Sequence, residues 1–301
     1  MQQTLKKSYT FCGKGLHSGV VANMTIRPAE AGSGIRFHRT DLGPGAIIRA
    51  LATNVSDTSR STTLSENGSS VSTIEHLMSA AAGLGIDNML VEIDAPEVPI
   101  LDGSALPYVK AIMTDGLAGQ GCERRSLSLD GPFHFKDDAS GASIDIFPAG
   151  ETQMRLTVDF NSKVLGVQSF EYTPQTDYAG QIAPCRTFCF FHELEFLASR
   201  GLIKGGDADN AIVIVEHPVD ENTLQRMRGI FGGGHLEVRE GYLNNLQLHF
   251  PDEIVRHKML DMIGDFALLG APLKGTIIAS KTGHRINTAV CKSLLESDLL
   301  K

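Results

Sequence analysis

The chain has 301 residues, 42% of them hydrophobic, and a formal net charge of −8. This length leaves room for roughly two domains of about 150 residues each, and the acidic balance gives no support to nucleic-acid binding. The apolar stretches are far shorter than the roughly 20 residues that cross a bilayer, so we expect no transmembrane segment and a cytoplasmic location.

The first half of the chain alternates short apolar runs with Gly, Pro and Asn turn signals, and these runs predict strands at 23–27, 47–50 and 89–94. A helix is predicted from Thr73 to Ala82, because Ser72 and Glu75 have the spacing of a capping box. A second helix is predicted from Pro107 to Asp115.

The Gly-rich and then charged segment Leu117–Arg125 is the best candidate for a linker, which predicts one domain at 1–124 and another at 125–301. Beyond it, strands are predicted at 126–129, 143–147, 154–160 and 211–215, and helices at 191–199 and 252–269. Residues 216–245, with their run of glycines at 232–234, are interpreted as a variable excursion. Strands and helices are mixed without regular alternation, which is typical of the α+β class.

The predicted helix at 252–269 carries polar residues at every fourth position: Glu253, His257, Asp261 and Asp265. A histidine and an aspartate one helical turn apart are close enough to bind the same ion. A charged ridge is more often a solvated face, and the spacing alone favours that interpretation.

Glu75 and His76 are adjacent near the start of the first predicted helix. Adjacent helical residues point about 100° apart, so one can bind a metal while the other reaches a water bound to it. The pattern alone favours Glu75 as a capping residue and leaves His76 as an ordinary helix histidine. The metalloprotease motif H-E-x-x-H is absent.

His284 follows a predicted strand in S-K-T-G-H, where an exposed turn residue is the simpler interpretation. The segment G-K-G-L-H-S-G at 13–19 lacks the spacing of a phosphate-binding loop. The five cysteines are spread without a C-x-x-C pair and are interpreted as reduced thiols.

Two other classes of function stay open. One is a metal-free hydrolase in which Asp265 and His284 activate Ser18, Thr187 or Ser280. The other is a non-catalytic carbohydrate or nucleotide-binding module.

Eight segments together resemble the UDP-3-O-acyl-N-acetylglucosamine deacetylase family, LpxC. They are G-L-H-S-G at 15, T-I-E-H-L at 73, G-L-G-I-D-N at 83, P-I-L-D-G-S at 99, C-R-T-F at 185, D-N-A-I-V at 209, R-H-K-M-L-D-M-I-G-D at 256 and K-T-G-H at 281. The resemblance runs in order over nearly the whole chain. It implies two similar α+β domains with helices sandwiched between their sheets and an active site in the cleft between the domains.

By this resemblance, His76, His257 and Asp261 are the ligands of a catalytic Zn²⁺, a site that Fe²⁺ can also occupy. Glu75 matches the general base, and Thr187 matches the residue that helps to hold the developing oxyanion. His284 matches the cationic residue that stabilises this charge or protonates the amine, and Asp265 matches its carboxylate partner.

The implied reaction hydrolyses the N-acetyl amide of UDP-3-O-(3-hydroxyacyl)-N-acetylglucosamine, a committed step of lipid A biosynthesis in Gram-negative bacteria, and we expect a monomer. The matching substrate contacts are Lys258 and Lys281 near the diphosphate, Phe160 near the uracil, and Phe188 with Leu202 and Gly206 along the passage for the acyl chain. The chain departs from the family pattern at Ser162 and Lys163, where His-Pro is common. It also ends at Lys301, before the tail that several members carry.

Overall fold

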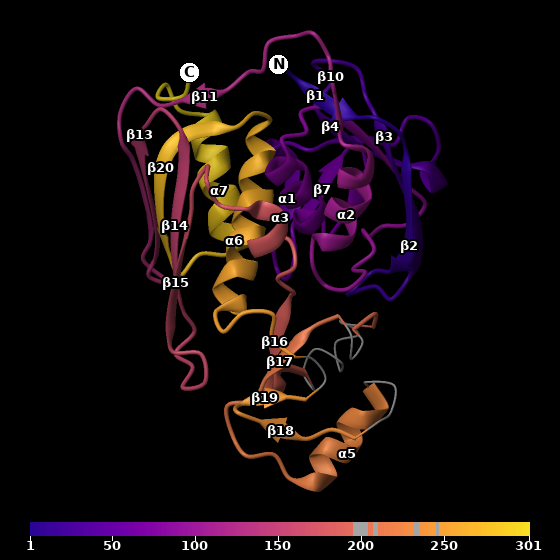
Figure 1. Cartoon of the computed structure of the whole chain (residues 1–301), viewed down its shortest axis with the longest axis vertical. Coiled ribbons are helices and arrows are strands. Elements are labelled where there is room, and N and C mark those ends of the chain that lie inside the picture. Colours follow the sequence, from indigo (N-terminus) through magenta and orange to yellow (C-terminus); the bar gives the residue numbers. More distant parts are fainter. Residues whose placement is uncertain (195–203, 207–209, 231–234, 245–246) are drawn as a thin grey trace.

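The computed structural model describes residues 1–194, 204–206, 210–230, 235–244 and 247–301. They fold into two large sheets, a layer of helices between them, and a smaller body at one end of that layer (Figure 1). The expected α+β class, with helices sandwiched between sheets, is confirmed. No described helix is long and apolar enough to cross a membrane.

The first large sheet has five strands, which come from residues before position 94. Its strand order is β2 (Tyr9–Lys14), β3 (Val21–Pro28), β9 (Met89–Ile93), β4 (Ile35–Arg39) and β5 (Ile47–Arg49). Only β4 and β9 pair in parallel. Along β3, Ala22, Met24 and Ile26 alternate with more exposed residues, so one face of the sheet is apolar and packs on the helices.

Two smaller sheets accompany the first. In one, β1 (Gln3–Leu5) pairs with β10 (Leu117–Gly119); the other consists of β6 (Val55–Asp57), β7 (Thr63–Glu66) and β8 (Ser69–Val71). The segment interpreted as a linker therefore begins with a strand that is tied to the start of the chain.

The second large sheet comes from residues after position 126. Its order is β12 (Phe133–Asp137), β13 (Ala142–Pro148), β20 (Leu273–Ser280), β14 (Thr152–Asp159) and β15 (Val167–Tyr172), and β11 (Leu127–Ser128) also pairs with β20. Strand β20 is in the middle, parallel to β14 and antiparallel to β13.

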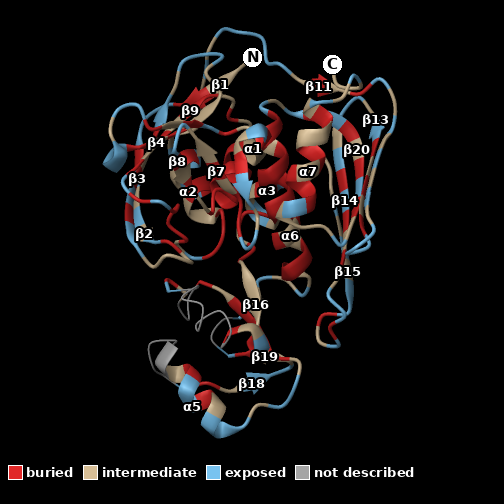
Figure 2. Cartoon of the chain, turned by 180° about the vertical axis from the view of Figure 1, so that it is seen from behind, coloured by how far each residue is buried: buried red, intermediate tan, exposed pale blue. Residues whose placement is uncertain are grey.

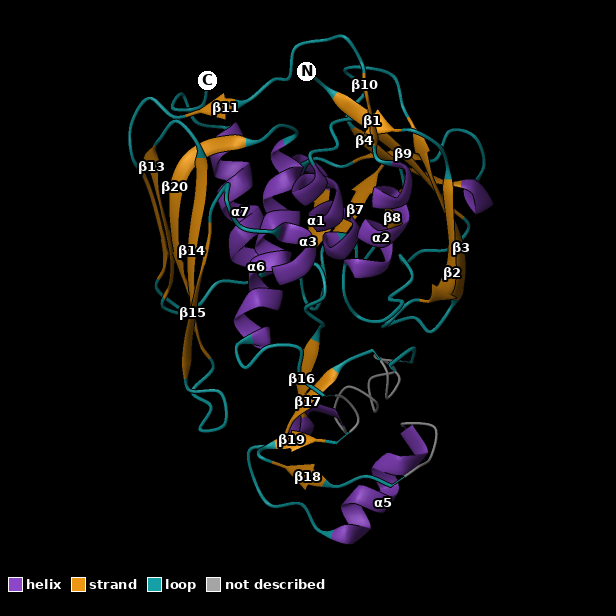
Figure 3. Ribbon diagram, in the orientation of Figure 1, coloured by secondary structure: helices purple, strands orange, loops and turns teal. Residues whose placement is uncertain are grey.

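The helices of the middle layer lie between the two large sheets (Figure 3). They are α1 (Glu75–Leu84), α2 (Leu106–Asp115), α3 (Tyr178–Gln181), α6 (Glu253–Phe266) and α7 (His284–Leu295), with short 3₁₀ turns η1 (Thr40–Leu42), η2 (Ala52–Asn54) and η3 (Ala267–Leu269). Of these helices, α1 and α6 are the most buried (Figure 2). Helix α1 packs directly on α6 at Gly264, where an added Cβ would lie 2.2 Å from the carbonyl oxygen of Glu75. A glycine is required for this close approach.

The predicted excursion at 216–245 belongs to the smaller body. This body contains β16 (Phe188–Phe190), β17 (Ile212–Ile214), β18 (Val238–Arg239), β19 (Tyr242–Leu243) and α5 (Glu221–Ile230). It has its own apolar cluster, which includes Val213, Leu224, Met227 and Leu243. The helix predicted at 191–199 is described only over 191–194, where it is helical, and the glycines at 232–234 lie outside the described residues.

Two sequence predictions about the helices are wrong. Helix α1 begins at Glu75 rather than at Thr73, and it has no side-chain cap. Ser72 turns instead toward Pro96, whose carbonyl oxygen accepts hydrogen bonds from the Ser72 amide and hydroxyl. The polar ridge of α6 is not a solvated face, because its four residues are all buried.

Candidate metal and active site

Three buried side chains from two helices form a cluster suited to a metal ion. His76 is in the first turn of α1, and His257 and Asp261 are one turn apart on α6. One ligand atom from each residue lies within 4.8 Å of the others. The Nε2 atoms of His257 and His76 are 3.4 Å and 3.9 Å from Oδ1 of Asp261. The close packing of α1 on α6 therefore joins residues that are far apart in the sequence.

The atoms of this cluster fit a cation. Oδ1 of Asp261 is buried without a hydrogen-bond partner among the described residues, which is costly unless an ion completes its environment. Nδ1 of His257 donates a 3.0 Å hydrogen bond to the carbonyl oxygen of Cys185. The other ring nitrogen of His257, Nε2, is therefore free to bind a metal ion. Burial lowers the pKa of His257, and lowers that of His76 to about 3, which keeps both rings neutral. Two imidazoles and a carboxylate suit Zn²⁺ or Fe²⁺.

Glu75 lies beside this cluster. Its Oε2 accepts a 3.0 Å hydrogen bond from the amide of Thr62, and its Oε1 is 3.8 Å from Nε2 of His284. Burial raises the pKa of Glu75 to about 7; His284 opposes this shift, whereas Asp261 and Asp265 add to it. Glu75 is therefore positioned as a proton acceptor rather than as the capping residue that the pattern favoured.

His284 is the first residue of α7 and its side chain is only 10% exposed, so its interpretation as an exposed turn residue is wrong. Its Nδ1 donates a 3.0 Å hydrogen bond to Oδ2 of Asp265, which also accepts one of 2.9 Å from Asn287. Burial works against the charged ring, but Asp265, Asp261 and Glu75 outweigh it and raise the pKa of His284 to about 9.

Thr62 connects the base to the His–Asp pair and was not found from the sequence. It is fully buried; its amide binds Glu75 as above, and its hydroxyl donates a 2.6 Å hydrogen bond to Oδ1 of Asp265. The same hydroxyl oxygen is 3.2 Å from Nδ1 of His284. Nothing in the local S-T-T-L sequence predicts these contacts, because the partners are 13 and 203 residues away.

Glu97 was also missed. Its buried carboxylate accepts hydrogen bonds from the amides of His17 (2.9 Å) and Ser18 (2.7 Å) and from the hydroxyl of Thr73 (2.9 Å). A Cβ on Gly15 would lie 2.4 Å from this carboxylate. The G-K-G-L-H-S-G segment thus wraps around a glutamate of its own chain and supplies no phosphate-binding loop of the usual kind.

Thr73 has a φ of 57°, which is unusual for a β-branched residue, and it stands two residues before Glu75. Glu97 therefore ties the loop at 15–19 to the strained entry of α1. Both ring nitrogens of His17 are buried without a hydrogen-bond partner among the described residues, and the ring lines the same cavity as the metal cluster.

That cavity has a volume of about 450 Å³ and lies between the two halves of the chain and the smaller body. Its lining includes most of the candidate residues: Glu75, His76, Thr187, His257, Lys258, Asp261, Lys281, His284, Phe160 and Phe188. Asp265 lies behind His284. Gly206 is described but is not among the lining residues, and Leu202 lies outside the described residues.

The two lysines of the cavity are held by carboxylates. Nζ of Lys258 is 2.8 Å from Oδ2 of Asp261, and Nζ of Lys281 is 2.9 Å from Oδ2 of Asp159. The rings of Phe160 and Phe188 meet edge to face, with centroids 5.5 Å apart. The cavity lining thus includes two aromatic rings and two lysines that are paired with carboxylates.

A metal-free serine or threonine mechanism finds no support in these contacts. Among the described residues, neither Ser18, Ser280 nor Thr187 hydrogen-bonds to His284, whose ring is engaged by Asp265 and Thr62. Thr187 is held through its backbone, since its amide donates a 2.8 Å hydrogen bond to the carbonyl oxygen of Gly103.

Comparisons with known proteins identify relatives of this chain. The LpxC family model, described as UDP-3-O-acyl N-acetylglycosamine deacetylase, matches residues 2–231 and 228–296. The UDP-3-O-acyl-N-acetylglucosamine deacetylase of Citrifermentans bemidjiense is 41% identical over 297 residues, which cover 98% of this chain and 89% of the relative. That of Myxococcus xanthus is 41% identical over 295 residues, which cover 98% and 86%.

A third relative, the bifunctional enzyme LpxC/FabZ of Bacteroides thetaiotaomicron, is 40% identical over 294 residues. The match covers 97% of this chain but only 64% of that relative, so the chain spans less than two thirds of its length. The match to the family model over nearly the whole chain, with similar relatives of the same description, shows that the chain belongs to the UDP-3-O-acyl-N-acetylglucosamine deacetylase family.

Proposed function

We propose that the protein is a metal-dependent deacetylase that hydrolyses the N-acetyl amide of UDP-3-O-(3-hydroxyacyl)-N-acetylglucosamine to acetate and the free amine. The observation that carries this proposal is the meeting of His76, His257 and Asp261 with Glu75 and His284 in one cavity. The names of the relatives supply the substrate. By the same resemblance, the reaction is a committed step of lipid A biosynthesis, carried out by a cytoplasmic monomer.

His76, His257 and Asp261 would hold the metal, which we propose to be Zn²⁺, with Fe²⁺ as the alternative that the same donor set accepts. When bound, such an ion polarises the amide carbonyl and lowers the pKa of a water molecule toward about 7. The unpartnered Oδ1 of Asp261 supports this assignment.

Glu75 would take a proton from the attacking water as the oxygen of that water bonds to the carbonyl carbon. A pKa near 7 for Glu75 suits this role. His284 would enter the reaction protonated and give its proton to the amide nitrogen as the C–N bond breaks. Asp265 accepts from Nδ1 of His284, so the proton on Nε2 points into the cavity. Thr187 would help to hold the charge that develops on the carbonyl oxygen.

The substrate contacts are proposed from the same resemblance. Lys258 and Lys281 would approach the diphosphate, and Phe160 with Phe188 would pack against the uracil and the start of the acyl chain. Leu202 and Gly206 complete the proposed acyl passage. Residues 1–124 and 125–301 are proposed as the two domains, each built around one of the large sheets, so that Glu75 and His76 come from one domain and the remaining site residues from the other.

The proposal is tested by acetate release from the UDP-linked substrate. Glu75→Gln keeps the shape of the side chain but removes the proton acceptor, and we expect turnover to fall by about 10²–10⁴-fold. The metal content of this variant should equal that of the unchanged protein. Normal acetate release by a metal-loaded Glu75→Gln variant would reject the proposal. An exposed glutamate, Glu171, provides the matched control, because Glu171→Gln should leave turnover unchanged.

A further inference from the structure

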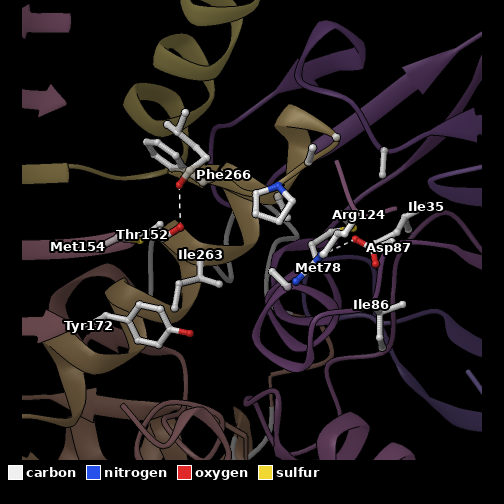
Figure 4. Close-up of a pocket in the computed structure, with 17 residues that line it drawn as sticks. Ile35, Met78, Ile86, Asp87, Arg124, Thr152, Met154, Tyr172, Ile263 and Phe266 are labelled. Carbon is white, nitrogen blue, oxygen red and sulfur yellow. Dashed lines mark hydrogen bonds and ion pairs between the residues drawn. The ribbon is translucent and has the colours of Figure 1, made fainter. Parts of the chain in front are cut away.

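A second cavity lies between the two large sheets, away from the metal cluster (Figure 4). Its volume is about 250 Å³, and its lining comes from both sheets and from helices α1 and α6. None of the residues that line it also lines the cavity of the metal cluster. It is therefore a separate site, and the proposed reaction does not use it.

The walls of this cavity are mostly apolar. They include Met78, Ala82, Met154, Ile263, Phe266 and Leu273. A water molecule needs two or more polar partners to be held well, and the apolar part of these walls offers none. Atoms that line an unfilled space also lose dispersion contacts. Hydrocarbon is the chemistry that fills this space favourably.

Four polar side chains border the cavity, and two of them are already paired with acceptors. The hydroxyl of Thr152 donates a 2.7 Å hydrogen bond to the carbonyl oxygen of Leu273. Nε of Arg124 donates one of 2.8 Å to Oδ1 of Asp87, whose Oδ2 accepts from the amide of Gln3. The carboxylate of Asp87 thus has both of its oxygens engaged.

The groups left over are hydrogen-bond donors. The terminal nitrogens of Arg124 have no hydrogen-bond partner among the described residues, and neither has the hydroxyl of Tyr172 (Figure 4). Burial raises the pKa of Tyr172, so its O–H stays intact at neutral pH and can donate. A ligand that satisfies the terminal nitrogens of Arg124 must bring acceptor atoms. A carboxylate can accept from both of these nitrogens while Nε stays paired with Asp87.

We propose that this cavity binds a short aliphatic carboxylate, with its chain against the apolar side chains of α1 and α6 and its carboxylate at the exposed Arg124. At roughly 30 Å³ per heavy atom, the volume of a liquid water molecule, the space holds about eight atoms. This accommodates the seven-carbon alkyl chain of octanoate with its carboxylate outside, at Arg124, which makes octanoate a suitable probe. The occupant contacts both helices of the metal cluster, since Met78 is two residues after His76 and Ile263 is two residues after Asp261.

The test uses methyl NMR of the metal-loaded protein labelled at its methionines. Met78 and Met154 line the cavity, whereas Met113 is exposed on α2 and Met227 packs in the smaller body. We expect octanoate to shift the Met78 and Met154 signals in a saturable manner and to leave the other two in place. Octanoate bound only in the metal-site cavity, where none of the described methionines lies, would leave Met78 and Met154 unshifted and would overturn the proposal.

Two variants separate the carboxylate from the chain. Arg124→Gln should weaken octanoate about tenfold or more while leaving the binding of octanol, which lacks the charge, nearly unchanged. Its neighbour Arg125 is exposed and does not line the cavity, so Arg125→Gln should bind both probes normally. Ala82→Leu should fill the space and remove both sets of shifts. Equal octanoate affinity in Arg124→Gln and Arg125→Gln, or unchanged binding in a folded Ala82→Leu variant, would contradict the proposal.

Discussion

The carboxylate of Asp265 holds the ring of His284 through a 3.0 Å hydrogen bond from Nδ1 to Oδ2, although Asp265 is not part of the metal cluster. The pair links α6 to the start of α7, and it leaves Nε2 of His284 facing Glu75 and Asp261 at 3.8 Å each. Asp265 therefore sets both the orientation and the charge of the proposed proton donor.

Removing that charge should change the pH dependence of the reaction. Asp265 is the strongest of the influences that raise the pKa of His284 to about 9, so in Asp265→Asn the ring loses its proton at a lower pH. Because the protonated ring is the proposed active form, the alkaline limb of the kcat profile should move to lower pH, and kcat at neutral pH should fall. The exposed pair His134–Asp145 supplies the control, and Asp145→Asn should leave the profile in place. An unmoved alkaline limb in Asp265→Asn would show that His284 is not the group observed.

Thr62→Val should lower both stability and kcat, although valine has nearly the same shape as threonine. The substitution removes the hydroxyl that donates to Asp265 and leaves a buried carboxylate oxygen short of a partner, at a cost of about 1–3 kcal/mol in the free energy of unfolding. Urea unfolding measures this loss, and kcat should fall as well. Thr62→Ser, which keeps the hydroxyl, should recover most of both. Thr25, whose hydroxyl makes only an exposed contact, serves as the control through Thr25→Val.

Glu97→Gln should loosen the loop at 15–19 and the entry to α1 together. The amide group of glutamine places its own N–H groups against one of the present donors, so at least one backbone or hydroxyl donor loses its acceptor, which costs about 1–3 kcal/mol. Activity should fall further than stability alone explains, because Thr73 leads directly to Glu75 and His76. Glu92→Gln, at an exposed ion pair with Arg27, should change neither quantity. Unchanged unfolding and turnover in Glu97→Gln would mean that this carboxylate does not organise the site.

Gly264→Ala should separate the two helices that carry the metal cluster. The new methyl would lie 2.2 Å from the carbonyl oxygen of Glu75, so α1 and α6 must move apart, and overpacking of this kind costs about 1–3 kcal/mol. Metal affinity should fall along with stability in calorimetric measurements. Gly119→Ala adds the same methyl in open space and should be nearly neutral. Wild-type metal affinity in Gly264→Ala would show that helix spacing does not govern the cluster.

Several of the elements were predicted correctly from the sequence. The strands at 23–27 and 89–94 and the helix at 107–115 lie where turn signals and apolar runs predicted them. The four-residue spacing of His257, Asp261 and Asp265 correctly placed them on one face of a helix. The burial of this helix face was not predictable from periodicity, because α6 is covered by α1, α7 and strands β14 and β15 of the second large sheet, none of which directly adjoins it in the sequence.

The remaining errors have the same physical origin. Glu75 fitted a capping box because local spacing cannot show that its carboxylate turns to Thr62. Thr62 and Glu97 carry no motif at all, and they matter through contacts made across the fold. The local sequence favoured an exposed turn at His284, because the residues next to it do not indicate that its ring contacts Asp265.

The most direct test of the central claim is metal analysis by mass spectrometry on protein purified without added metal. We predict about one zinc or iron ion per chain, lost in His76→Ala while circular dichroism shows the fold retained, and kept in His134→Ala, which removes an exposed histidine. An unchanged protein that holds no metal and takes up none from added zinc, or a folded His76→Ala variant that keeps its full metal content, would contradict the account.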